Sequence, residues 1–298
     1  MTISTNVLLS IIIPTHDRWD MLSELLGTIP DREDVEVVVV DDHSAEVRDI
    51  DSPFSRTTLR LLRAPAGQRY AGMARNQALD AAGGRFLFFA DSDDKIETRA
   101  FGRALDYLEV FGGDVLYGFL SSFDAASCMP GSRHLAANWL IDQFRETSDT
   151  DFLFRMHVPY GKFIRRDFVE SHGLRFGATR VSNDVLFNLD LVRRKPSAEV
   201  FDAAVYSVRQ GHDSLTSNTT RDTLMVRLDV LNAYNSGLVE AGKPHLRSPA
   251  TGYIRKALRV EPSMVPAMMI RAWKGNTPLL PPIWTLHNSL ARKMHQAS

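Results

Sequence analysis

Short apolar runs alternate with amphipathic segments over the first two thirds of the chain. The runs that suit strands buried on both faces cover residues 7–13, 35–40, 57–62, 85–90 and 115–119. The segments with apolar residues at helical spacing cover residues 19–29, 73–82 and 97–110. This alternation predicts an α/β fold with a mostly parallel, Rossmann-like sheet flanked by helices.

Two of the predicted strands end in carboxylates. Asp41 and Asp42 follow the second strand, and the run D-S-D-D at 91–94 follows the fourth. Ligands of such sheets bind beyond the carboxyl ends of the strands, so both acidic ends should face one crevice. Carboxylates crowded this closely repel each other unless a cation lies between them, and aspartate oxygens suit Mg²⁺ or Mn²⁺. A polar strand end that caps a helix is the alternative, because D-x-D alone is a common triplet.

The glycine-rich nucleotide motifs are missing. Neither G-x-G-x-x-G nor G-x-x-x-x-G-K-[ST] occurs, so a diphosphate at this crevice would need a cation to hold it. Further along, residues 181–184 open another predicted helix. Ser182 or Asn183 is the expected N-cap, which puts Asp184 in the first turn, where the helix dipole favours its ionised form by about 0.3–1 kcal/mol.

Composition narrows the class of protein. The 298 residues are 44% apolar, enough for one large domain or a domain with an appendage. A formal net charge of -1 argues against a nucleic-acid binder. The single cysteine, Cys128, excludes an intramolecular disulfide and suits a reducing compartment. Residues 7–13 are too short for a transmembrane helix and lack the basic start of a signal peptide, so we expect a cytoplasmic protein.

The character of the chain changes near residue 216. We expect a catalytic domain over 1–216 and a helical C-terminal extension over 217–298. Within the extension, residues 249–298 are basic and carry Trp273 and Trp284 among other apolar residues. Two interpretations stay open: helices that pack on the catalytic domain, or peripheral contact with the cytoplasmic face of a membrane.

Seven segments together point to a family. They read I-I-I-P-T-H-D-R (11–18), V-V-V-V-D-D-H-S (37–44), A-G-M-A-R-N-Q-A-L (71–79), F-F-A-D-S-D-D (88–94), G-K-F-I-R-R (161–166), S-N-D-V-L-F-N-L (182–189) and R-Q-G-H-D-S-L-T (209–216). In this order they resemble the family 2 glycosyltransferases, inverting enzymes of the GT-A fold. The resemblance covers about residues 7–216 and leaves out the tail.

The resemblance implies a role for each matching residue. Asp93 would bind the metal directly, Asp91 would reach the ribose or a metal-bound water, and Asp184 would be the general base. The remaining residues implied in donor binding are Pro14, Thr15, Asp41, Arg75, Asn76, Ser92 and His212. The implied reaction moves a hexosyl or N-acetylhexosaminyl group from a nucleoside-diphosphate sugar, with UDP favoured, to a saccharide or lipid-linked saccharide, as in polysaccharide or glycolipid assembly.

Asn183 departs from the family pattern, which usually has an acid there. A catalytically dead nucleotide-sugar-binding protein is therefore one alternative, although Asp91 and Asp93 are both retained. An aspartate-nucleophile phosphatase is another. Its D-x-D should follow the first strand, with Thr or Val two residues after the second Asp, whereas here the strand is the fourth and Lys95 holds that position.

Overall fold

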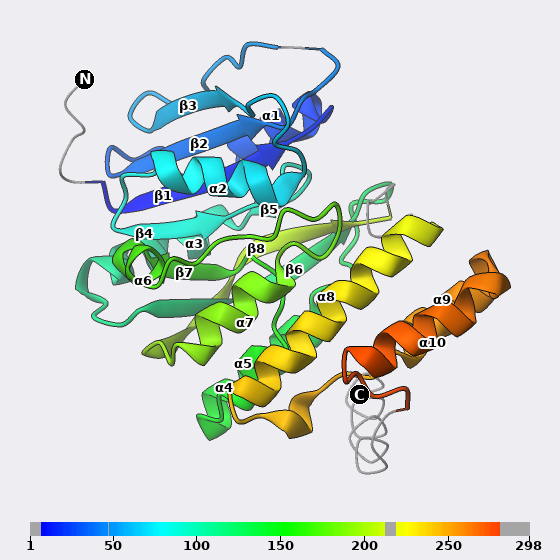
Figure 1. Ribbon diagram of the computed structural model, residues 1–298. Helices are drawn as coiled ribbons and strands as arrows, with labels where there is room; N and C mark the ends of the chain where they lie inside the picture. Colours follow the sequence, from blue (N-terminus) through cyan, green and yellow to red (C-terminus); the bar gives the residue numbers. More distant parts are fainter. Residues whose placement is uncertain (1–6, 47, 212–218, 281–298) are drawn as a thin grey trace. The chain divides into compact units, whose positions relative to one another are not determined.

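The computed structural model describes residues 7–46, 48–211 and 219–280 (Figure 1). The chain divides into two compact units, Met1–Asp213 and Ser214–Ser298. The predicted domain boundary at residue 216 falls outside the described residues and stays a prediction.

The first unit contains all the strands that the structure describes. They are β1 (Leu9–Thr15), β2 (Val35–Asp41), β3 (Thr58–Arg63), β4 (Phe86–Phe89), β5 (Lys95–Ile96), β6 (Val115–Asp124), β7 (Lys162–Arg165) and β8 (Ala198–Gln210). Its helices are α1 (Trp19–Leu26), α2 (Ala71–Ala81), α3 (Thr98–Val110), α4 (Leu135–Thr147), α5 (Asp151–Phe154), α6 (Arg166–Ser171) and α7 (Val185–Arg193). β5 and α5, of two and four residues, were not predicted, because so few residues show no periodicity.

The strands form one sheet in the order β3-β2-β1-β4-β7-β6-β8-β5. The half made of β3, β2, β1 and β4 is parallel throughout, as is the pair β6–β8. The pairs β4–β7, β6–β7 and β5–β8 are antiparallel. The predicted α/β fold with a mostly parallel sheet is confirmed, and the carboxyl ends of β1, β2 and β4 lie at one edge.

Helices cover both faces of this sheet. One face packs Ile11, Val37 and Phe88 against apolar residues of α1 and α3, and Phe88 meets Phe101 of α3 edge to face at 5.0 Å. On the other face, α2 lies in front of β1 and β2 (Figure 1). β1, β2 and β4 are buried along their whole length, which accounts for their mostly apolar sequences. The buried polar residues Ser10 and Glu36 within them are joined by a hydrogen bond.

The second unit is helical where it is described. It contains α8 (Arg221–Glu240), the 3₁₀ turns η1 (Pro244–Leu246) and η2 (Pro262–Met264), and the helices α9 (Thr251–Val260) and α10 (Val265–Lys274). Thr220 begins α8 with a capping box, in which the Thr220 and Thr223 side chains each accept a backbone N–H of the other residue. Among the described residues, no helix has the length and apolar character needed to cross a bilayer.

Candidate active site

The three carboxylates after β4 point to three different partners. Asp91 accepts a hydrogen bond from Arg75 Nη2, and Asp93 forms an ion pair with Arg18 Nη1. Asp94 turns inward instead and is buried. The expectation that one shared cation relieves their repulsion is therefore incomplete, because separate arginines and burial relieve part of it.

Asp94 is held by two donors from β8. Tyr206 donates its hydroxyl to Asp94 Oδ2 at 2.9 Å, and the backbone N–H of Arg209 donates to Oδ1 at 2.7 Å. Burial, reinforced by the charges of Asp91 and Asp93, raises the pKa of Asp94 well above its usual value. Asp94 therefore anchors the loop. Asp91 and Asp93, the two acids of the D-x-D, are the carboxylates that face a ligand.

Arg209 and Tyr206 are site residues that the sequence did not reveal. Arg209 Nε donates to the backbone carbonyl of Asp93 at 2.6 Å, and its Nη2 pairs with Glu24. The Tyr206 hydroxyl accepts the N–H of Asp91 at 2.8 Å. Arg209 belongs to the R-Q-G-H segment. The family resemblance singled out this segment, but it did not indicate which residues Arg209 contacts.

The donor set at this loop fits a hard divalent cation. The side chains of Asp91 and Asp93 are 35% and 14% exposed, so solvent reaches both carboxylates. No group of three or more His, Cys, Asp or Glu side chains forms a metal cage within the described ranges. Mg²⁺ is commonly held by one or two carboxylates with phosphate and water oxygens completing the shell, and the D-x-D offers that number of protein ligands.

Arg75 links this loop to the start of α7. Its guanidinium is buried, and its Nη1 donates to Asn183 Oδ1 at 3.0 Å while Nη2 holds Asp91. Phe176 lies under the guanidinium at 5.3 Å and stacks on Phe187 of α7. Arg75 is thus the hydrogen-bond partner of the Asn183 amide. A carboxylate, the usual residue type at this position in the family, could accept the same hydrogen bond.

Asp184 is the N-cap residue of α7, not a first-turn residue as predicted. The helix begins at Val185, and the Asp184 side chain makes no capping hydrogen bond. Ser182 has a left-handed φ of 58°, and Asn183 and Asp184 form a turn before the helix, so the cap lies one or two residues later than the pattern predicts. Burial raises the pKa of Asp184, and the positive charge of Arg75 opposes this rise. A carboxylate with a raised pKa is a stronger proton acceptor, as a general base requires.

Gly72 allows α2 to approach the residue before Asp184. A Cβ at Gly72 would lie 2.2 Å from the carbonyl oxygen of Gly177 and 2.9 Å from Asn183 Cβ. No real side chain tolerates such contacts, so residue 72 must be glycine for Arg75, on the same helix, to reach Asn183.

Two polar atoms at the ends of β1 and β2 have no hydrogen-bond partner among the described residues. Thr15 and Asp41 are both 2% exposed and sit opposite each other in the sheet register. Asp41 Oδ1 accepts the N–H of Ser44, but Asp41 Oδ2 and Thr15 Oγ1 have no hydrogen bond. Arg63 Nε lies 3.6 Å from Asp41 Oδ2. Buried polar atoms left unpaired cost roughly 1–3 kcal/mol each, so this pair suits a ligand that pairs with them.

The other predicted donor-binding residues have varied surroundings. Pro14 is buried within β1, and Ser92 is buried between the two D-x-D carboxylates. Asn76 exchanges two hydrogen bonds with the backbone of Phe176, which fixes the loop before α7. Their roles in donor binding stay predictions, and His212 lies outside the described residues.

Lys162, in the G-K-F-I-R-R segment, lies fully buried beneath α7. Its Nζ donates to Asn188 Oδ1 at 2.5 Å and to the carbonyl of Met156 at 2.8 Å. The backbone N–H of Asn188 in turn donates to the carbonyl of Asp184 at 3.0 Å. The lysine therefore secures the first turn of the helix that presents Asp184.

We expect Lys162 to make stability depend on pH. Burial lowers its pKa from 10.5 to about 7, with the charge of Asp184 opposing. The unfolded chain then binds more protons than the folded chain between these values, so the free energy of unfolding should rise with pH there, by at most about 1.4 kcal/mol per pH unit. Urea unfolding of wild type and Lys162→Met at pH 7, 8 and 9 would measure this. A stability difference between the two proteins that does not change with pH would contradict it.

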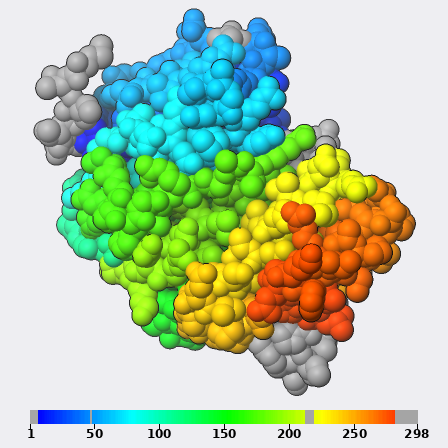
Figure 2. All heavy atoms as spheres, viewed as in Figure 1, coloured from blue at the N-terminus to red at the C-terminus, as the bar shows by residue number. Residues whose placement is uncertain are grey.

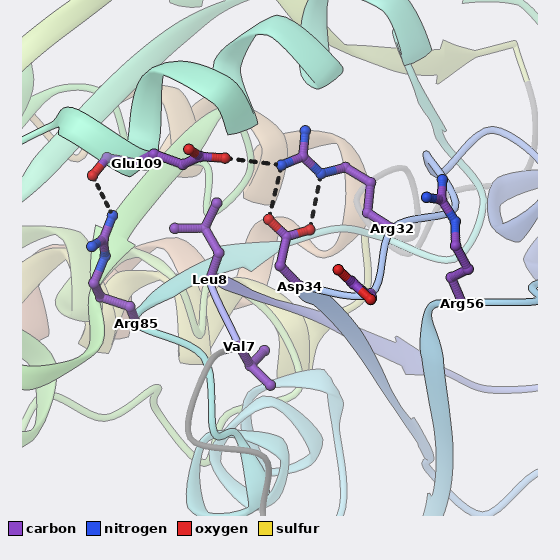
Figure 3. A pocket seen from close by; sticks show the side chains of 8 residues that line it. Val7, Leu8, Arg32, Asp34, Arg56, Arg85 and Glu109 are labelled. Carbon is purple, nitrogen blue, oxygen red and sulfur yellow. Dashed lines mark hydrogen bonds and ion pairs between the residues drawn. The ribbon is translucent and has the colours of Figure 1, made fainter.

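A hollow at the opposite edge of the sheet is not this site. It is lined by Val7, Leu8, Arg32, Glu33, Asp34, Arg56, Arg85 and Glu109, at the amino ends of β1, β2 and β4 (Figure 3). Arg32 is held there by Asp34, Asp106 and Glu109. The positive charge of Arg32 is therefore compensated by these carboxylates. Neither the D-x-D nor Asp184 lies at this edge of the sheet.

Comparison with known proteins agrees with this geometry. The family model described as Glycosyl transferase family 2 matches residues 10–173, more than half of the chain. The chain therefore belongs to glycosyl transferase family 2. It is 24% identical over 219 residues to the uncharacterized glycosyltransferase EpsJ of Bacillus subtilis, covering 70% of this chain and 63% of EpsJ.

Other similar proteins carry more specific names. Over 113 residues, 36% of this chain and 20% of the relative, it is 30% identical to the poly(ribitol-phosphate) beta-N-acetylglucosaminyltransferase TarS of Staphylococcus aureus. The structure of TarS 1-349 in complex with UDP-GlcNAc has a TM-score of 0.67 at 19% identity, over 90% of this chain and 80% of that one. The mannosyltransferase PcManGT of Pyrobaculum calidifontis, in complex with GDP-Man and Mn²⁺, has a TM-score of 0.53 at 16% identity, over 96% and 80%. The chain spans less than two thirds of the length of EpsJ and TarS, and the structural likenesses establish the fold alone.

Proposed function

We propose that this protein is an inverting glycosyltransferase that moves a sugar from a UDP-sugar to an acceptor hydroxyl. The observation that carries the proposal is a pair of buried atoms at the carboxyl edge of the sheet, Thr15 Oγ1 and Asp41 Oδ2, neither of which has a hydrogen bond to another described residue. Asp41 Oδ2 can accept the imide N–H of uracil, and the threonine hydroxyl can donate to a base or ribose oxygen. The UDP-GlcNAc in the TarS structure of similar fold supports the same donor class.

The residues around this pocket supply what the transfer needs. Asp91 and Asp93 would hold Mg²⁺ or Mn²⁺, which offsets the charge of the diphosphate leaving group. Arg75 fixes Asp91 and the loop of Asn183 relative to each other. Asp184 would accept the proton of the attacking hydroxyl. With one base and no covalent intermediate, direct attack inverts the anomeric configuration.

We infer a hexosyl or N-acetylhexosaminyl donor and a saccharide or lipid-linked saccharide acceptor. The name of TarS supports a polymer acceptor and polysaccharide assembly. The catalytic part would be residues 1–216 and the helical extension residues 217–298, in a cytoplasmic protein with peripheral membrane contact. Neither alternative has comparable support: the D-x-D follows the fourth strand and has Lys95 where a phosphatase would have Thr or Val, and Asp184 is present as the base that a dead protein would not need.

We expect Asp41→Asn to weaken UDP binding at least about tenfold. The substitution keeps the oxygen that accepts the Ser44 N–H, but it puts an amide donor opposite the imide N–H of the base. Loss of one such hydrogen bond corresponds to roughly 1.4 kcal/mol or more. Titration calorimetry with UDP and GDP would measure the effect, with Asp20→Asn on the exposed side of α1 as a control. Unchanged UDP affinity in Asp41→Asn, at an unchanged melting temperature, would remove the basis of the UDP proposal.

A further inference from the structure

Helix α10 presents an apolar stripe to solvent. Met268 and Ala272 are buried in its own unit, whereas Met269, Ile270 and Trp273 are 42%, 55% and 75% exposed. The spacing of the three exposed residues puts them on one side of the helix. A single exposed apolar residue would need no explanation, but three adjacent ones that include a tryptophan form the kind of patch that marks an interaction surface.

The neighbouring helix α9 adds positive charge and more exposed apolar area. Ala257 is buried, while Leu258 and Val260 are 54% and 43% exposed. The turn η2 joins the two helices, and both lie at the surface in the space-filling view, coloured orange to red (Figure 2). The surface formed by the exposed residues of α9 and α10 is called the α9–α10 face below.

The α9–α10 face has a surplus of cations. Residues 249–280 hold five basic residues and one acid, Glu261. Glu261 pairs with Arg221, and Arg271 pairs with Asp229. Within the part of the chain that the structure describes, the other cations have no carboxylate within ion-pair distance; they are Arg255, Lys256, Arg259 and Lys274.

This combination selects an anionic lipid surface over a protein partner. Protein interfaces are enriched in Trp, Met and Arg, which this face also has, but they are depleted in lysine, and two of the four cations without a carboxylate partner here are lysines. An amphipathic helix with basic residues beside Trp and aliphatic side chains lies in the headgroup region of a bilayer, where the indole prefers to sit. Lysine and arginine at that depth attract anionic headgroups. Each helix has ten residues, which is enough to lie in this interface and too few to cross it.

We propose that the α9–α10 face attaches this protein peripherally to membranes that contain anionic phospholipid. Attachment requires the apolar stripe for insertion and the unpaired cations for attraction. Polar substitutions in the stripe and added salt should therefore each weaken it. It does not depend on the donor site, since all its residues belong to the second unit.

Co-sedimentation of the full chain with vesicles tests this proposal. We expect binding to phosphatidylcholine vesicles containing phosphatidylglycerol at low salt, release at high salt, and no binding to pure phosphatidylcholine. The double substitution Ile270→Ser with Trp273→Ser should lower the bound fraction at least about tenfold, and Lys256→Glu with Lys274→Glu should do the same. The matched controls on α3 are Val110→Ser, an apolar residue 80% exposed, and Arg103→Glu, an exposed cation; both should bind like wild type.

Several outcomes would overturn the proposal. One is wild-type protein that stays in the supernatant with anionic vesicles at low salt. Another is a stripe variant that binds as well as Val110→Ser. A third is a concentration-dependent dimer in sedimentation velocity that the stripe variant loses, which would assign the face to a second copy of the chain. Circular dichroism and melting temperature confirm that each exposed-residue variant is folded.

Discussion

Replacing Asp93 by alanine should reduce sugar transfer at least about 10²-fold and abolish metal-dependent binding of the nucleotide. Asp93 ends the D-x-D on a loop that Arg209 and Tyr206 hold rigidly, so its carboxylate is preorganised for a cation at the diphosphate. Removal of one preorganised electrostatic group commonly costs about 10²–10³ in rate. EDTA should inactivate the wild type to the same extent, and added Mn²⁺ or Mg²⁺ should restore wild type alone.

The matched control is Asp20→Ala on α1, whose side chain is 96% exposed. It removes one carboxylate without touching the loop and should leave activity unchanged. Asp93→Asn separates charge from size, and its activity should resemble that of Asp93→Ala. Full activity in Asp93→Ala, or in wild type with EDTA, would show that transfer does not require a metal bound by Asp93.

Asp184→Asn should lower kcat at least about 10²-fold while the affinity for the nucleotide-sugar stays within a few fold. The amide keeps the size of the side chain at the start of α7 but cannot accept the proton of the acceptor hydroxyl. Because Asp184 makes no capping hydrogen bond, the substitution removes none from the helix. Steady-state kinetics of transfer, with donor binding measured separately, distinguishes the two effects.

The pH dependence of kcat supports the same assignment. Burial raises the pKa of Asp184, so kcat of the wild type should fall as the pH is lowered through that raised value, and the residual activity of Asp184→Asn should not. Asp190→Asn, on the same helix and paired with Arg193, is the control and should behave as wild type. Equal losses of binding and turnover in Asp184→Asn would make Asp184 a residue of the pocket and not the base.

The sequence predicted β1, β2 and β4 well, because these three strands are buried along their whole length and are therefore mostly apolar. It also placed Asp41 and Asp91 at one edge, since parallel strands share the direction of their carboxyl ends. A short strand at residues 160–164 was predicted, but neither its antiparallel direction nor its place between β4 and β6 was, since strand order depends on contacts between distant segments. The spacing of apolar residues along the sequence contains no information about those contacts.

Partners of the acidic residues were the least predictable part of the site. Nothing in D-S-D-D indicates that Asp94 turns inward to Tyr206 while Asp91 turns to Arg75. Tyr206 lies 112 positions from Asp94 in the chain, and Arg75 lies 16 positions from Asp91. The N-cap of α7 was predicted one or two residues too early, at Ser182 or Asn183. Ser182 has a left-handed φ, a conformation that serine seldom adopts and that the sequence pattern does not predict.

The release of free nucleotide from a panel of UDP- and GDP-sugars, with saccharide acceptors and with Mn²⁺ or EDTA, tests the central claim most directly. The account predicts Mn²⁺-dependent release of UDP by the wild type, with transfer of the sugar at inverted configuration and little release by Asp184→Asn. UDP binding without release from any donor would instead describe a binding protein. Liberation of inorganic phosphate with the sugar left in place would describe a phosphatase, and either result would contradict the assignment.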